Sequence, residues 1–212
     1  MTSWAIPTGT KYYVECLVLQ VANSGIVFGV ANPDIDLPTS IEADSSMNGF
    51  LFVGYSGSEW RTNALENGVR QGWSGNVGLT SARVMAITID RVANEVKCYL
   101  DNSLITSGTV SISATQEYHI VCSKSSGAHP AVHMNINAGH DSTGAGDFSA
   151  GTATDENGFG SFQHAPPSGF LALCSANLPT ADEVDPAQTD DDYPKKLFSP
   201  IIYTGNGGTL AV

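Results

Sequence analysis

Basic residues are scarce in this chain, which has 9 Lys and Arg against 21 Asp and Glu and a formal net charge of −12. A surface of this sign repels phosphate backbones, so we expect no nucleic-acid partner. Long apolar runs are absent as well. No stretch approaches the roughly 18 apolar residues of a membrane helix, so we expect no membrane insertion.

Cysteine is also sparse. The four cysteines, Cys16, Cys98, Cys122 and Cys174, lie far apart and form no C-x-x-C pair. The first three lie inside apolar, strand-like patterns. They therefore indicate small buried hydrophobic residues, and neither zinc ligands nor a disulfide framework. A disulfide between neighbouring strands remains open.

Strand patterns dominate what is present. Residues 84–90 form an apolar, β-branched run, residues 91–94 resemble a turn, and residues 95–100 alternate polar and apolar side chains. This predicts an antiparallel hairpin with one buried face. Further strands are predicted at 12–19, 25–31, 50–55, 59–63, 69–73, 118–123, 131–137 and 170–174. Their even spacing predicts an all-β fold, a sandwich of two antiparallel sheets.

The predicted organisation is one domain and an extension. Residues 1–175 form the sandwich, and residues 139–162 are a Gly-rich loop insertion that is either functional or disordered. Residues 176–212 form an acidic, irregular C-terminal arm, with six of the 21 acidic residues between 182 and 192. The only short helix expected lies around 180–189. The arm is either a solvated tail or a docking segment for a basic neighbour.

Several strand strings resemble SPRY domains of the concanavalin A-like superfamily. Residues 11–16 (KYYVEC) resemble the family's opening "G-K-Y-Y-W-E-V", and residues 25–31 resemble "x-x-I-G-V-A". Residues 84–102 resemble "I-G-V-x-L-D…I-x-F-Y-K-N-G", and residues 131–137 stand where "A-x-x-x-N-F-G" is usual. The chain departs from this pattern at Val14, which replaces Trp, and at residues 101–103.

A second resemblance is narrower. Residues 166–179 (PPSGFLALCSANLP) and 202–208 (IYTGNGG) are similar to strings in SPRY-like domains of tailed-bacteriophage structural proteins. This resemblance implies a virion protein made in the host cytoplasm. It also implies a homo-oligomer that contacts other virion proteins on the capsid or tail, with binding to a host surface as a further role.

Aromatic and arginine side chains near turns are the candidate ligand or interface residues, because interfaces and sugar sites favour these types. They are Tyr55, Trp60, Arg61, Arg70 and Trp73. Core packing is the competing interpretation for the tryptophans. The alternative function is therefore a lectin-like module that binds cell-surface glycans.

No catalytic set emerges, so we expect no enzyme; a glycoside hydrolase would need a carboxylate pair that the strands lack. We expect no cofactor. Asp141, Asp147 and Asp155, with Glu156, are weak calcium candidates in the Gly-rich stretch. We interpret four histidines as scattered surface residues and not as the ligands of a metal site: His129, His133, His140 and His164.

Overall fold

The structure is a computed structural model that describes residues 5–21, 26–33, 47–55, 59–67, 69–70, 83–124, 132–139 and 150–178. Within these ranges the regular structure is almost entirely β. The strands are β1 (Lys11–Val21), β2 (Ile26–Ala31), β3 (Met47–Tyr55), β4 (Glu59–Glu66), β5 (Val69–Arg70), β6 (Arg83–Asp90), β7 (Glu95–Leu100), β8 (Ser103–Ser111), β9 (His119–Lys124), β10 (Val132–Asn137) and β11 (Leu171–Ala172). One short 3₁₀ helix, η2, covers Ser175–Asn177.

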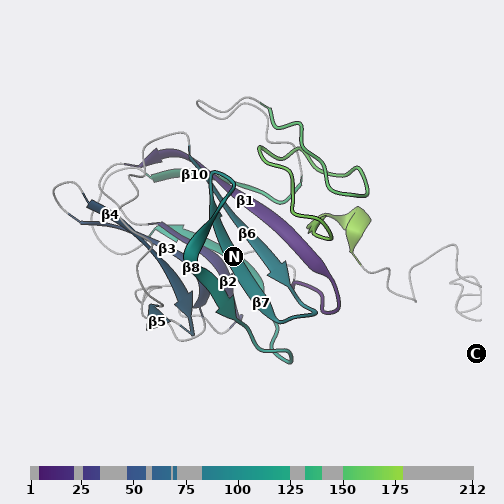
Figure 1. Cartoon of the computed structure of the whole chain (residues 1–212), viewed down its shortest axis with the longest axis horizontal. Coiled ribbons are helices and arrows are strands. Elements are labelled where there is room, and N and C mark those ends of the chain that lie inside the picture. The colour runs from purple at the N-terminus through teal and green to yellow at the C-terminus, as the bar shows by residue number, and fades with distance from the viewer. Residues whose placement is uncertain are drawn as a thin grey trace, which may run out of the picture. The chain divides into compact units, whose positions relative to one another are not determined.

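The strands form two sheets, which confirms the predicted β-sandwich (Figure 1). Sheet A has the order β10-β1-β6-β7-β8, with β11 also paired to β1, and sheet B has the order β5-β4-β3-β2-β9. All pairs are antiparallel except β11 with β1, which is parallel. Neighbours in the sheets are often distant in sequence, as the pairing of β1 with β10 shows.

The hairpin of β6 and β7 lies in sheet A as predicted, with Ile87 opposite Cys98 in its centre. Its turn is closed by Asp90, whose Oδ1 accepts hydrogen bonds from the backbone N–H groups of Val92 and Ala93 at 2.9 and 2.7 Å. The other oxygen of Asp90 lies 2.7 Å from Lys11 Nζ. Burial opposes the charge, but the lysine and the two N–H donors lower the pKa of Asp90.

The main core lies between the two sheets. Alternate residues of β1, including Tyr12, Val14 and Cys16, pack with Phe28 of β2 and Ile87 of β6 in one buried cluster. The half-buried, alternating pattern of β7 fits a strand with one face in this core. In contrast, β6 is buried on both faces, so a further layer must cover the other face of sheet A.

Some boundaries differ from the sequence prediction. β3 begins at Met47, because Met47 and Asn48 pair with β2, and β4 continues to Glu66, because Glu66 pairs with Val69 of β5. The strand β8 (Ser103–Ser111) was not predicted. Its pairing with β7 is interrupted by a bulge, and Ser, Thr and Gly in its sequence give only a weak strand signal.

The chain divides into two units, Met1–Leu178 and Pro179–Val212. The second unit lies outside the described residues, and so does the short helix expected at 180–189. In the part of the chain that the structure describes, no helix has the length and apolarity to cross a membrane.

Candidate interaction surface

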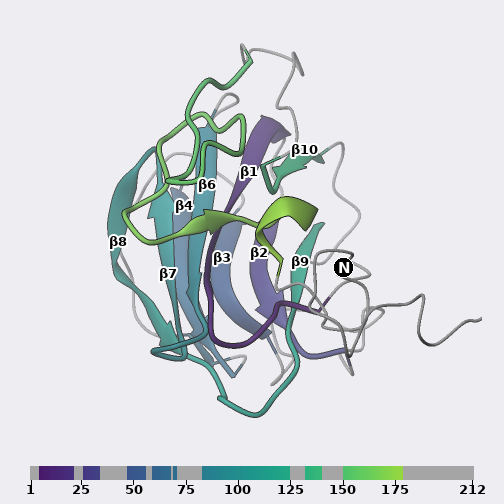
Figure 2. The ribbon, with the colours of Figure 1, turned by 90° about the vertical axis from the view of Figure 1, so that its right-hand side faces the viewer.

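A segment that we name the cap, residues 150–178, lies on the face of sheet A turned away from sheet B. It appears in green in front of β1 and β6 in Figure 2. The cap places Phe162 and Ala172 against Tyr13 and Ala86, which belong to the opposite face from the main core. The rings of Tyr13 and Phe162 meet edge to face, with centroids 5.1 Å apart. The cap is the layer that buries the second face of β6.

Glu15 of β1 fastens the cap to the sheet. Its side chain is fully buried, and its two oxygens accept four hydrogen bonds. The donors are Tyr13 Oη at 3.1 Å, Asn137 Nδ2 at 3.2 Å, and the backbone N–H groups of Gln163 and His164, both at 2.9 Å. Burial raises the pKa of the Glu15 carboxyl, and the hydrogen bonds only partly offset this. Glu15 is therefore a structural acid.

Asp155 organises the cap from within. Its Oδ1 accepts from the backbone N–H groups of Asn157 and Phe159, both at 2.9 Å. Its Oδ2 accepts from the backbone N–H of Ala172 at 2.8 Å and from Asn177 Nδ2 at 2.6 Å. Although burial raises it, these four hydrogen bonds together lower the pKa of Asp155 below its ordinary value. Asp155 thus ties the start of the cap to its end.

The string that resembles phage proteins builds the end of the cap. Its Phe170 N–H donates to the carbonyl of Pro167, and Asn177 Nδ2 also donates to the carbonyl of Ala172. Leu171 and Ala172 form β11 beside β1, in place of the longer strand predicted at 170–174. Leu178 packs against the main core. This string therefore folds as part of the sandwich, up to the last described residue.

Gly139 and Gly160 are required by the close approach of the cap. Both have positive φ, +110° and +106°, a region that other residues rarely adopt. A Cβ at Gly160 would lie 2.5 Å from the ring of Phe162, and one at Gly139 would lie 2.6 Å from the Cβ of Ala172. Gly139 and Gly160 of the Gly-rich stretch thus serve packing.

Beside the cap, β7 presents a half-exposed strip that we define as Glu95, Lys97 and Tyr99. Lys97 Nζ lies 2.5 Å from Glu95 Oε1, and this carboxylate raises the pKa of Lys97. At the other border of the cap, Lys11 Nζ lies 5.6 Å from the ring centroid of Phe170. The β7 strip and the cap together form the candidate interaction surface.

The predicted ligand residues fall on sheet B. In the register, Tyr55 is opposite Glu59, Trp60 is opposite Gly54, and Arg61 is opposite Val53. Arg70 of β5 is opposite Leu65. Trp73 lies outside the described residues. The other four predicted residues thus belong to strands of sheet B.

Among the described residues, no group of three or more His, Cys, Asp or Glu side chains could hold a metal ion. Asp155 offers a cation no free lone pair, since its two oxygens already accept four hydrogen bonds. Asp141, Asp147, His129 and His140 lie outside the described ranges. His133 is in β10, and His164 contributes its backbone N–H to Glu15.

Sequence reasoning missed the role of Glu15, because a single acid within a predicted strand gives no sign of its partners. Its partners in the cap lie 148 and 149 residues further along the chain, so no local pattern reveals them. For Asp155 a signal existed. Asp155-Glu156-Asn157-Gly158 is the composition of an Asx-type turn, which the structure shows between Asp155 and Phe159.

The lowered pKa of Asp155 predicts a pH dependence. The folded state favours the carboxylate form of Asp155. The contribution of Asp155 to stability is therefore complete above about pH 5. It is lost as the pH falls through 3.8, the ordinary pKa of an Asp side chain, and then through the lower pKa of Asp155 in the folded state. Compared with the parent protein, Asp155→Asn is expected to lower the unfolding free energy by about 1–3 kcal/mol at pH 7. Urea unfolding of both proteins between pH 7 and pH 3 should show this difference shrinking in acid. A difference that stays constant or grows would contradict the assignment.

No protein-family model matches the chain, and no curated protein matches it in sequence. Among solved structures, the chain is similar to the SPRY domain of human HERC1, with 15% identity, a TM-score of 0.48, and coverage of 63% of this chain and 77% of that chain. It is also similar to the TRIM65 PSpry domain (14% identity, TM-score 0.42, coverage 57% and 61%) and to sheep galectin-11 in complex with glycerol (10%, 0.31, 62% and 95%). Two of these three structures are SPRY domains.

Proposed function

We propose that the protein is a non-enzymatic structural component of a tailed-phage particle, on its capsid or tail, that acts through protein–protein contacts. The observation that carries this proposal is that the string resembling tailed-phage structural proteins builds the end of the cap. Residues of this string, including Phe170, Ala172 and Asn177, take part in the cap's hydrogen bonds and packing. The string therefore helps to hold an outer layer on the sandwich, and a protein that acts through contacts can present this layer to a neighbour.

The buried acids support contact over catalysis. A general acid or base must have a carboxyl oxygen within reach of substrate. Glu15 and Asp155 use both oxygens on donors of the cap and its neighbours. Asp90 uses its oxygens on its own turn and on Lys11. Each of these three carboxyl side chains therefore stabilises the folded structure.

In this proposal the acidic arm binds a neighbouring protein, and the sandwich is the folded domain that carries the arm. Leu178 packs on the main core, so the arm to be removed starts at residue 179. We expect the full chain to form a defined oligomer and the chain without residues 179–212 to be a monomer with an unchanged melting temperature. Light scattering and thermal unfolding of both forms test this.

A shorter truncation product provides the matched control. Ending the chain at Cys174 also removes Asn177 and Leu178, and with them one hydrogen bond to Asp155 and a core contact. This form is expected to melt at a lower temperature, which distinguishes loss of docking from loss of folding. If the oligomer survives removal of 179–212, the docking role of the arm is wrong.

A monomer in both forms would instead favour the alternative, a lectin-like module that binds glycans. Tyr99 supports this alternative, because it is a half-exposed aromatic residue beside Lys97 at the border of the cap. Aromatic side chains with polar neighbours are suited to stacking on sugars. A glycan array with the full chain would then be the deciding measurement.

A further inference from the structure

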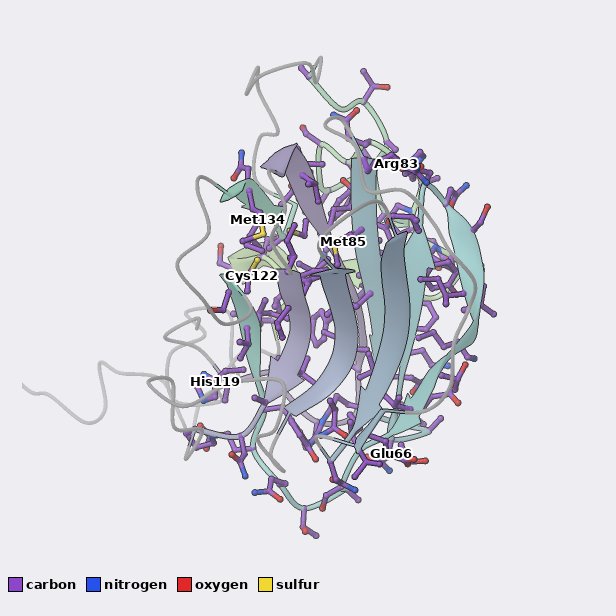
Figure 3. All side chains as sticks on the ribbon, turned by 90° about the vertical axis from the view of Figure 1, so that its left-hand side faces the viewer. Glu66, Arg83, Met85, His119, Cys122 and Met134 are labelled. Atoms are coloured by element: carbon purple, nitrogen blue, oxygen red, sulfur yellow. The ribbon has the colours of Figure 1, made fainter. Side chains whose placement is uncertain are left out.

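Two free thiols touch each other across the sandwich. Cys16 lies in β1 of sheet A and Cys122 in β9 of sheet B, 106 residues further along the chain. Their Sγ atoms are 3.7 Å apart. The sulfur of Met134, in the strand β10 that pairs with β1, lies 3.6 Å from Cys122 Sγ. Figure 3 shows the side chains of Met134 and Cys122 next to each other. Cys122 is thus the middle member of a row of three sulfur atoms.

We propose that Cys16 and Cys122 are a modification site, at which a small oxidising disulfide such as oxidised glutathione installs an intramolecular disulfide between the two sheets. A disulfide has sulfur atoms about 2.05 Å apart, so the pair must close by about 1.7 Å from its present 3.7 Å. Rotation of two facing side chains and a small approach of the strands supply such a movement. No refolding is needed.

The two thiols differ in access, and this sets the order of reaction. Cys122 is half-buried, whereas Cys16 is fully buried. The hydrogen bond with Cys122 and burial both raise the pKa of Cys16, which holds it in the unreactive thiol form. Because the thiolate is the nucleophile, Cys122 reacts first with an oxidant from solution.

The chemistry then runs in two exchanges. The Cys122 thiolate attacks one sulfur of oxidised glutathione, forms a mixed disulfide and releases one glutathione thiolate, which takes up a proton. Cys16, 3.7 Å away, then attacks Cys122 Sγ; its proton passes to the departing glutathione sulfur, which leaves as the second reduced glutathione. In sum, two protein thiols and one oxidised glutathione give one protein disulfide and two reduced glutathiones.

The remaining two cysteines serve as internal controls. Cys98 is buried in β7, and Cys174 is half-buried in the cap, next to the outer cluster of sheet A. A protein in which both are replaced, Cys98→Ala with Cys174→Ser, retains only the proposed pair. Its two thiols can then be counted directly.

The test is oxidation of this double variant, folded, with millimolar oxidised glutathione and a metal chelator. We expect both thiols to be lost, the mass to fall by two hydrogens, and one cross-linked peptide to contain Cys16 and Cys122. The melting temperature should rise by roughly 5–15 °C, because the bridge closes a long loop, and a thiol reductant should reverse the change.

Adding Cys16→Ala to the double variant separates the two exchanges. It keeps Cys122 but removes the second nucleophile, so the expected product is a stable glutathione adduct at Cys122. Retention of both thiols by the folded double variant would overturn the proposal. So would a cross-link in the parent protein that joins a different pair, or a cross-link that forms only in denaturant.

Discussion

Glu15→Ala is expected to lower the free energy of unfolding by about 3–5 kcal/mol, one of the two largest effects of a single substitution in this chain. The change removes the acceptor for four hydrogen bonds at once. The donors left behind are the hydroxyl of Tyr13, the amide of Asn137 and the backbone N–H groups of Gln163 and His164. Tyr13 and Asn137 are buried, and a buried donor without an acceptor costs the full penalty of its desolvation.

The measurement is urea unfolding of the parent and variant proteins at neutral pH. Glu95→Ala is the matched control, because Glu95 lies on the same face of sheet A but is half-exposed and paired only with Lys97. Its effect should stay below about 1 kcal/mol. Equal effects of the two substitutions would show that Glu15 does not hold the cap.

Phe162→Ala should cost a similar amount, about 3–5 kcal/mol, for a different reason. The ring is fully buried, and it packs on Tyr13 and lies against Gly139 and Gly160. Removing it leaves a cavity between the cap and the sheet that the glycines cannot fill. Because Ala153 and Phe162 exchange backbone hydrogen bonds at 3.1 and 2.8 Å, we expect the cap to open locally as well.

Hydrogen exchange distinguishes this local opening from general destabilisation. In Phe162→Ala the amides of Ala153, Gln163 and His164 should exchange faster, while those of the β6–β7 hairpin remain protected. Phe159→Ala is the control from the same cap, since its ring is 41% exposed and its loss should change stability by less than about 1 kcal/mol. Uniformly faster exchange across both sheets would contradict a separable cap.

The sheets could be predicted because their signals are local. The run 84–90, the turn 91–94 and the alternation in 95–100 each occur within a few residues, and the structure has the hairpin at these positions. Turn residues with positive φ, such as Asn94 at 57° and Asn102 at 63°, likewise show in the sequence as asparagines between strands.

The cap could not be predicted in the same way. From Ala150 to Phe162 the chain has no apolar period, and it holds its shape through single polar side chains and one buried ring. The Gly-rich composition suggested a loop insertion, but the described part of it is ordered by Asp155, Phe162 and Glu15. Carboxylates that accept hydrogen bonds from distant backbone leave no periodic trace in a sequence.

The candidate surface was predicted less well than the fold. Tyr99 and Lys97 were noted only as members of a strand, and the cap that borders them was not foreseen. Arg61 and Arg70 of the predicted set lie in strands of sheet B, and Trp73 lies outside the described residues. Their role as ligand or interface residues stays a prediction.

The place of β1 in the fold has a consequence for synthesis in the cell. The residues that cover the second face of β1, such as Phe162 and Ala172, leave the ribosome about 150 residues after this strand. Until then the outer face of sheet A lacks this cover over Tyr13 and Ala86. The nascent chain therefore exposes apolar side chains that favour association with other chains until the cap has been synthesised.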